Sequence, residues 1–95
     1  MKEDQHIEFK ESWHDEYTRY VSAFCNTQGG VLYIGLNDNG TVVGIEHPEK
    51  LIERLPNFIA QKTGIMPLVH LKESNGKEYL EIEKMIWSYF RYYRN

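Results

Sequence analysis

The chain has 95 residues, of which 41% are hydrophobic and 26% are charged. A chain of this length buries only about two-thirds of its unfolded surface, so it forms one domain rather than two. The composition excludes a disordered or fibrous protein, and no apolar run reaches the roughly 20 residues of a membrane helix. The formal net charge of -3 argues against a surface devoted entirely to phosphate binding. The acidic N-terminus lacks the features of a signal peptide, so we expect a cytosolic protein.

An amphipathic helix is predicted over residues 14–27. Its apolar side chains recur at intervals of three and four residues from Tyr17 to Cys25. Gly29 and Gly30 follow, and paired glycines permit the left-handed backbone of a terminating turn. Residues 31–36 are apolar on both faces, which predicts a strand inside the sheet.

Two hairpins and a second helix are predicted after this strand. Asn39-Gly40 suits a type I′ turn, with residues 41–45 as the returning strand, and a second hairpin joins residues 68–73 to 78–84. Between the hairpins, a helix should run from Pro48 to Gly64 and be kinked or broken at Pro56. The expected order is strand, helix, hairpin, helix, hairpin. This order predicts a single small α/β (α+β) domain over residues 1–95, with a mixed sheet and two main helices.

The segment 85–95 differs in composition from the rest of the chain because it is rich in aromatic and basic residues. Packing in the core or in a homodimer would keep these aromatic side chains out of water, and stacking on nucleic-acid bases is the alternative. The last twelve residues carry Lys84, Arg91 and Arg94 without any acid, whereas the first sixteen are mainly acidic. Cys25 is the only cysteine and the four histidines lack zinc-ligand spacing, so no cofactor is expected for a binding function.

Three segments together resemble the Schlafen-type AlbA domain. The first is Glu8-Phe9-Lys10-Glu11-Ser12, the second runs from Val21 through Asn26-Thr27-Gln28-Gly29-Gly30 to Asn37-Asp38, and the third is residues 39–45. A helix ending in Asn-Thr-X-Gly-Gly, followed by a strand ending in Gly-X-Asn-Asp, is a specific composite over about half the chain. After the last predicted strand the resemblance leads us to expect a longer segment, so the tail over 85–95 is expected to be truncated or divergent.

The resemblance implies a nucleic-acid-binding domain, with DNA favoured over RNA, in bacterial proteins assigned as transcriptional regulators. Longer members of the family carry an ATPase-like region, although this chain contains no P-loop motif. The backbone of the Gly29-Gly30 turn could hold a phosphate, and the alternative is a purely structural turn. The residues expected to contact nucleic acid, through phosphates or by stacking, are Lys10, Arg19, Gly29, Gly30, Lys84, Arg91, Tyr92, Tyr93 and Arg94.

Two alternatives to simple binding stay open. The resemblance extends to Schlafen proteins that act as metal-dependent ribonucleases, and Glu3, Glu8 and Asp38 occupy the matching positions. Three carboxylates of this kind would hold Mg²⁺ or Mn²⁺ and activate water for attack on a phosphate. The other alternative is an interaction module that dimerises through its aromatic tail and binds no nucleic acid.

Overall fold

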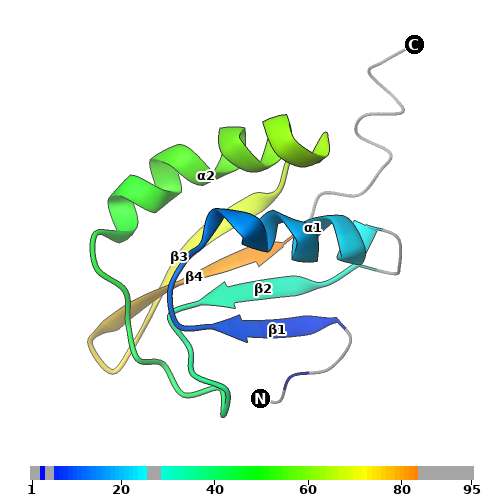
Figure 1. Cartoon of the computed structure of the whole chain (residues 1–95). Coiled ribbons are helices and arrows are strands. Elements are labelled where there is room, and N and C mark those ends of the chain that lie inside the picture. The colour runs from blue at the N-terminus through cyan, green and yellow to red at the C-terminus, as the bar shows by residue number, and fades with distance from the viewer. Residues whose placement is uncertain (1–2, 4–5, 26–28, 84–95) are drawn as a thin grey trace.

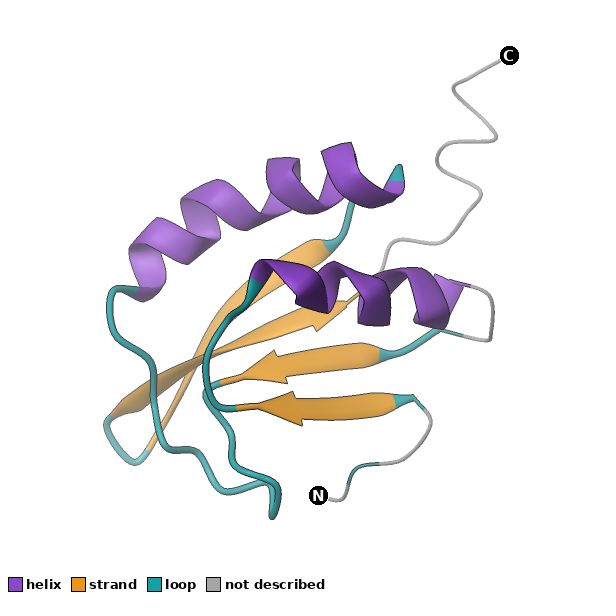
Figure 2. Ribbon diagram, in the orientation of Figure 1, coloured by secondary structure: helices purple, strands orange, loops and turns teal. Residues whose placement is uncertain are grey.

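The computed structural model describes residues 3, 6–25 and 29–83 of the chain (Figure 1). Its elements are β1 (Ile7–Lys10), a 3-10 helix (Asp15–Tyr17), α1 (Thr18–Cys25), β2 (Val31–Ile34), α2 (Pro48–Thr63), β3 (Leu68–Ser74) and β4 (Lys77–Glu83). The strands form one mixed sheet in the order β1-β2-β4-β3, in which only β1 and β2 are parallel. Figure 2 shows α1 and α2 on the same face of this sheet. The predicted fold class is therefore confirmed, and β2 lies inside the sheet as expected.

The main core lies between the two helices and the sheet. Alternate residues of the inner strands point to it, Leu32 and Ile34 from β2 and Leu80 and Ile82 from β4, because side chains alternate between the two faces of a strand. The helices contribute buried side chains that include Leu55 and Ile59 of α2. A second, smaller cluster lies on the opposite face of the sheet and contains Phe9, Tyr33 and Leu36.

The first predicted hairpin is wrong in its geometry. Beyond β2, residues 41–45 form no returning strand; an isolated bridge between Leu36 and Val42 and a few backbone hydrogen bonds join them to residues 35–37. The Asn37 side chain accepts hydrogen bonds from the backbone N–H groups of Asn39 and Thr41, and Asn39 does not adopt the positive φ that a type I′ turn requires. Both edges of β2 are already paired, one with β1 and the other with β4, so a returning strand has no place beside it.

The other elements agree with the sequence more closely. The second hairpin is confirmed, and its Asn75-Gly76 turn has the two positive φ angles, 53° and 77°, of a type I′ turn. The first helix begins as a 3-10 turn and becomes α-helical only at Thr18. The predicted break at Pro56 is not found, since α2 is continuous from Pro48 to Thr63. Buried Leu55 and Ile59 hold the helix to the sheet on both sides of the proline.

Within the described ranges, no helix combines the length and the apolar character needed to cross a membrane. Residues 84–95 lie outside the described residues, and they include Lys84, the last residue of the predicted strand, and the aromatic tail.

Candidate nucleic-acid interface

Two of the predicted phosphate-contacting residues, Lys10 and Arg19, lie together at the junction of β1 and α1. With Tyr17 and Tyr20 they form what we call the β1–α1 cluster. The Lys10 ammonium lies 5.1 Å from the ring centroids of both tyrosines, and the Arg19 guanidinium lies 5.3 Å from that of Tyr20. Lys10 can reach the helix because Phe9, its neighbour in the strand, points to the opposite face. The cluster therefore presents two cations held against aromatic rings.

Hydrogen bonding ties the cations to one phenol. A hydrogen bond with Tyr20 raises the pKa of Lys10, and hydrogen bonds from Arg19 and Lys10 lower the pKa of Tyr20. Glu8 also contacts Lys10, with its carboxylate oxygen 3.6 Å from the ammonium nitrogen. Arg19 is exposed, whereas the Lys10 side chain is 25% exposed. Lys10 is thus oriented in advance but partly neutralised, and Arg19 is the more accessible cation.

The three carboxylates expected to bind a metal do not gather at one point. Glu3 lies next to Glu8, and burial followed by the neighbouring Glu3 raises the pKa of Glu8. The Glu3 carboxylate also accepts a hydrogen bond of 2.8 Å from the backbone N–H of Phe9. Asp38 is exposed in the turn after β2, and within the described part of the chain it belongs to no group of three potential ligands within 4.8 Å. The predicted Mg²⁺ or Mn²⁺ site is thus not assembled by these residues in this structure.

The Gly29-Gly30 turn closes the other end of the β1–β2 pair. The Gly29 carbonyl lies 2.9 Å from His6 Nδ1, and the Val31 N–H donates to the His6 carbonyl at 2.9 Å. A Cβ atom on Gly30 would lie 2.5 Å from the Phe24 ring and 2.8 Å from the His6 carbonyl oxygen. Gly30 is therefore required for close packing, which supports the structural interpretation of this turn.

A second basic and aromatic surface lies on α2 and was not predicted from the sequence. Its members, Lys50, Arg54, Phe58 and Lys62, recur every four residues, and we call them the α2 stripe. The Arg54 guanidinium lies 4.4 Å from the Phe58 ring centroid, and the Lys62 ammonium lies 5.7 Å from it. Asp15 binds Arg54 through two hydrogen bonds of 2.8 and 2.9 Å. The four-residue spacing was visible in the sequence, since residues at i and i+4 share a helix face.

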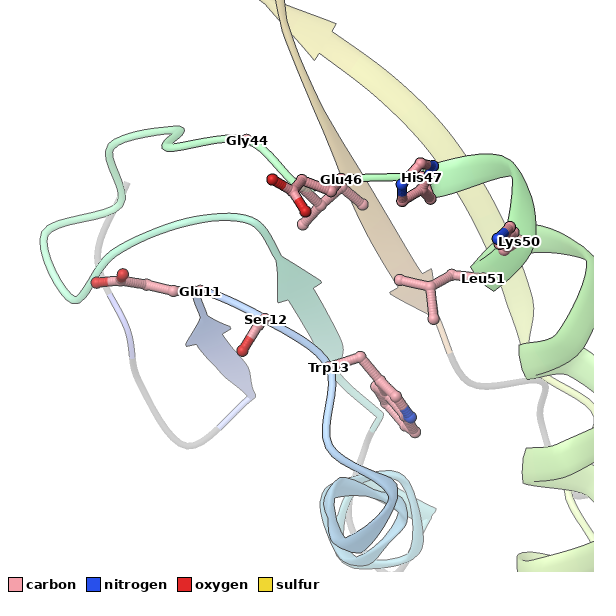
Figure 3. Close-up of a pocket in the computed structure, with 9 residues that line it drawn as sticks. Glu11, Ser12, Trp13, Gly44, Glu46, His47, Lys50 and Leu51 are labelled. Atoms are coloured by element: carbon pink, nitrogen blue, oxygen red, sulfur yellow. The ribbon is translucent and has the colours of Figure 1, made fainter.

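An open pocket of about 490 Å³ lies between the segment that follows β1 and the start of α2 (Figure 3). The segment from Glu11 to Trp13 forms one wall, and residues 44–47 with Lys50 and Leu51 form the other. Trp13 and Leu51 pack against the main core, so the pocket has apolar sides beneath a charged rim. His47 at the rim adopts a left-handed conformation, with φ of 53°, immediately before α2 begins.

The remaining predicted contact residues lie outside the described residues. They are Lys84, Arg91, Tyr92, Tyr93 and Arg94.

Comparison with known protein families decides the assignment. The profile described as Schlafen, AlbA_2 matches residues 3–90, which is most of the chain. The chain belongs to the Schlafen AlbA_2 family. This confirms the resemblance carried by the motifs around Lys10, Gly29-Gly30 and Asp38.

Two solved structures resemble this Schlafen AlbA_2 domain. One is the N-terminal domain of a Nitrosomonas europaea protein described as related to the ATP-dependent DNA helicase RecG, with a TM-score of 0.70 and 26% identity. The similarity covers 90% of this chain and 66% of that one. The other is a crystal structure of a Corynebacterium diphtheriae protein, with a TM-score of 0.60 and 24% identity over 90% of this chain and 19% of that one. This domain therefore spans only part of each of these two structures.

Proposed function

We propose that this Schlafen AlbA_2 domain binds nucleic acid, with duplex DNA as the favoured ligand, as part of a bacterial regulator. The observation that carries the proposal is the β1–α1 cluster, in which Lys10 and Arg19 are held against the rings of Tyr17 and Tyr20. The description of the Nitrosomonas europaea protein as related to a DNA helicase supports the same class of ligand.

The chemistry of the cluster suits a phosphate backbone. Lys and Arg neutralise phosphates and release counterions, which supplies most of the affinity of non-specific binding. Tyrosine hydroxyls and rings add hydrogen bonds to phosphate and stacking on unpaired bases. Glu8 offsets part of the charge of Lys10, and the whole chain carries a net charge of -3. We therefore expect modest affinity that depends steeply on salt.

The α2 stripe extends the proposed surface on the helical side of the molecule. Lys50, Arg54 and Lys62 are exposed cations on one helix, although Asp15 occupies the Arg54 guanidinium. A phosphate would have to displace Asp15 in order to bind Arg54. The β1–α1 cluster should therefore contribute more of the binding than Arg54 does.

Fluorescence anisotropy with labelled duplex DNA, single-stranded DNA and structured RNA, at several salt concentrations, tests the proposal. For wild-type protein, the logarithm of the binding constant should fall linearly with the logarithm of salt concentration. The double variant Lys10→Gln, Arg19→Gln should reduce the slope on duplex DNA by about 2, because roughly one counterion is released for each phosphate contact. Lys77→Gln, a single-cation control at the tip of the β3–β4 hairpin, should leave the slope unchanged.

The other outcomes separate the alternatives. Absence of binding to all three ligands at low salt would overturn the proposal and favour the interaction module, which should then run at twice its 11.3 kDa mass in solution. If the protein binds structured RNA more tightly than either DNA, RNA rather than DNA is the favoured ligand. Cleavage of RNA that needs Mn²⁺ and is lost in Glu8→Gln would favour the ribonuclease, whose supporting observation is the close pair of Glu3 and Glu8.

A further inference from the structure

The β3–β4 hairpin brings one imidazole and two carboxylates together on the face of the sheet opposite α1 and α2. His70 of β3 lies directly across from Glu81 of β4, and Glu83 follows Glu81 by two residues on the same face. Their neighbours in β4, Leu80 and Ile82, point the other way into the main core. The three polar side chains are therefore held by a paired, two-stranded frame whose register is fixed by the Asn75-Gly76 turn.

The distances between these side chains suit a metal ion. One ligand atom from each residue lies within 4.8 Å of the other two, and within the described ranges this is the one group of three such residues that does so. His70 Nε2 lies 3.0 Å from a carboxylate oxygen of Glu83. Two ligands at about 2.0–2.1 Å from a shared tetrahedral ion lie about 3.3 Å apart, so this pair is already near the required spacing. The Glu81 carboxylate oxygen also lies within 4.8 Å of both, so a small side-chain movement would complete the set.

A neighbouring tyrosine orients the third ligand. The Tyr33 hydroxyl of β2 donates a hydrogen bond of 3.0 Å to Glu81, which pairs with Tyr33 across the strands. Outer hydrogen bonds of this kind position metal-ligating carboxylates and strengthen metal binding. The Glu81 side chain is 16% exposed, whereas those of His70 and Glu83 are 42% and 43% exposed, so Glu81 is the most buried of the three.

We propose that His70, Glu81 and Glu83 form a binding site for a divalent transition-metal ion, with Zn²⁺ as the favoured ion. The imidazole nitrogen favours Zn²⁺, Co²⁺ or Ni²⁺ over Mg²⁺ and Ca²⁺, which prefer oxygen ligands. Three protein ligands leave at least one position for water or an external group. The histidine spacing in the sequence gave no indication of this site, because its ligands come from two strands and meet only through the hairpin register.

One competing cation already contacts the site. The Lys72 ammonium lies 3.4 Å from the second carboxylate oxygen of Glu81, and its side chain is 46% exposed. The Lys72 side chain is half exposed and can turn into solvent, so a divalent ion can displace it from Glu81. Removing the Lys72 charge should therefore strengthen metal binding, whereas loss of a ligand should weaken it.

Calorimetric titration of tag-free protein with ZnCl₂, together with the visible absorption of the CoCl₂-loaded protein, tests the proposal. One Zn²⁺ should bind per chain, and Mg²⁺ at millimolar concentration should not displace it. His70→Gln and Glu83→Gln should each raise the Kd at least about tenfold, and Lys72→Met should lower it. At free Zn²⁺ about 100-fold above the Kd, the melting temperature should rise by roughly 11–22 °C.

A matched control lies at the start of α2. His47 and Glu49 also form an imidazole–carboxylate pair, at 3.6 Å, but they belong to no group of three ligands among the described residues. His47→Gln should leave the Kd for Zn²⁺ unchanged. The metal-free melting temperature of each variant separates loss of a ligand from loss of the fold. The proposal is overturned if folded wild-type protein binds no Zn²⁺, or if folded His70→Gln and Glu83→Gln bind it as tightly as wild type.

Discussion

Replacing Gly30 with alanine should destabilise the domain through a steric clash. An added Cβ would lie 2.5 and 2.6 Å from two carbons of the Phe24 ring, whereas carbon atoms in good contact lie about 3.5–4.0 Å apart. The ring cannot simply turn away, because Phe24 is only 6% exposed and packs in the main core. The third close atom is the His6 carbonyl oxygen, 2.8 Å away, which already accepts a hydrogen bond from Val31. Relief therefore requires a shift of the core or of the β1–β2 junction.

The expected loss follows from these contacts. Overpacking a core costs about 1–3 kcal/mol, and overlap with a buried ring and a backbone carbonyl puts this site near the upper end. Alanine restricts the unfolded chain more than glycine does, and this effect alone raises the free energy of unfolding by about 0.4–1 kcal/mol. The net loss in the free energy of unfolding should be about 2 kcal/mol, equivalent to a fall in melting temperature of roughly 8–16 °C for a domain of this size.

Urea unfolding followed by circular dichroism measures this loss, with Gly64→Ala as the control. Gly64 has a positive φ of 76° but nothing within 4 Å of an added Cβ, so its substitution tests backbone strain without a clash. That strain should cost about 1 kcal/mol. A Gly30→Ala loss no larger than the Gly64→Ala loss would refute the steric reasoning. If folded Gly30→Ala is as stable as wild type but binds DNA more weakly, the turn contacts phosphate instead.

Three further outcomes follow from the described contacts. The Trp13 indole and Arg54 lower the pKa of Asp15, so the contribution of Asp15 to stability is present above the ordinary aspartate pKa and is lost as pH falls through the lowered value. The urea midpoints of Asp15→Asn and wild type should therefore differ at pH 7 and converge near pH 2. A gap that stays constant with pH would contradict this. Leu55→Ala should cost about 2–5 kcal/mol in urea unfolding because Leu55 is fully buried, whereas Leu71→Ala, at a site 45% exposed, should cost less than about 1 kcal/mol. Arg54→Gln should reduce the salt slope of DNA binding by less than Arg19→Gln does, since Asp15 already occupies Arg54, and equal reductions would count against that ranking.

The elements that the sequence predicted well are those whose signals are local. The second hairpin, with its turn at Asn75-Gly76, and the strand from Val31 formed as expected, because turn chemistry and apolar runs act over a few residues. The turn at Asn39-Gly40 carried the same dipeptide but failed. There the Asn37 side chain supplies the closing hydrogen bonds, and β4 takes the edge of β2 that a returning strand would have needed. Competition between strands for one edge is a property of the whole sheet, so a local pattern could not reveal it.

The candidate sites also differ in whether a local sequence signal or the whole fold determines them. Lys10 and Arg19 were identified from the family motifs and from charge, and the structure places both against Tyr20. The α2 stripe was missed although its four-residue spacing is local. The group of His70, Glu81 and Glu83 could have been found by extending the second hairpin from its turn, since a two-residue loop at Asn75-Gly76 fixes His70 opposite Glu81. Asp38 was placed with Glu3 and Glu8 by its motif position, and among the described residues it belongs to no group of three potential ligands within 4.8 Å.

The cations of the proposed phosphate site and the ligands of the proposed metal site lie on opposite faces of the sheet. Lys10 and Arg19 lie on the helical side at the β1 edge, whereas His70, Glu81 and Glu83 lie on the opposite side towards the β3 edge. Strands are spaced by about 4.8 Å, so β1 and β3 are about 14 Å apart, which exceeds the Debye length of about 8 Å at physiological salt. Separated sites without shared partners act additively. A phosphate backbone and a divalent ion should therefore bind this small domain almost independently of each other.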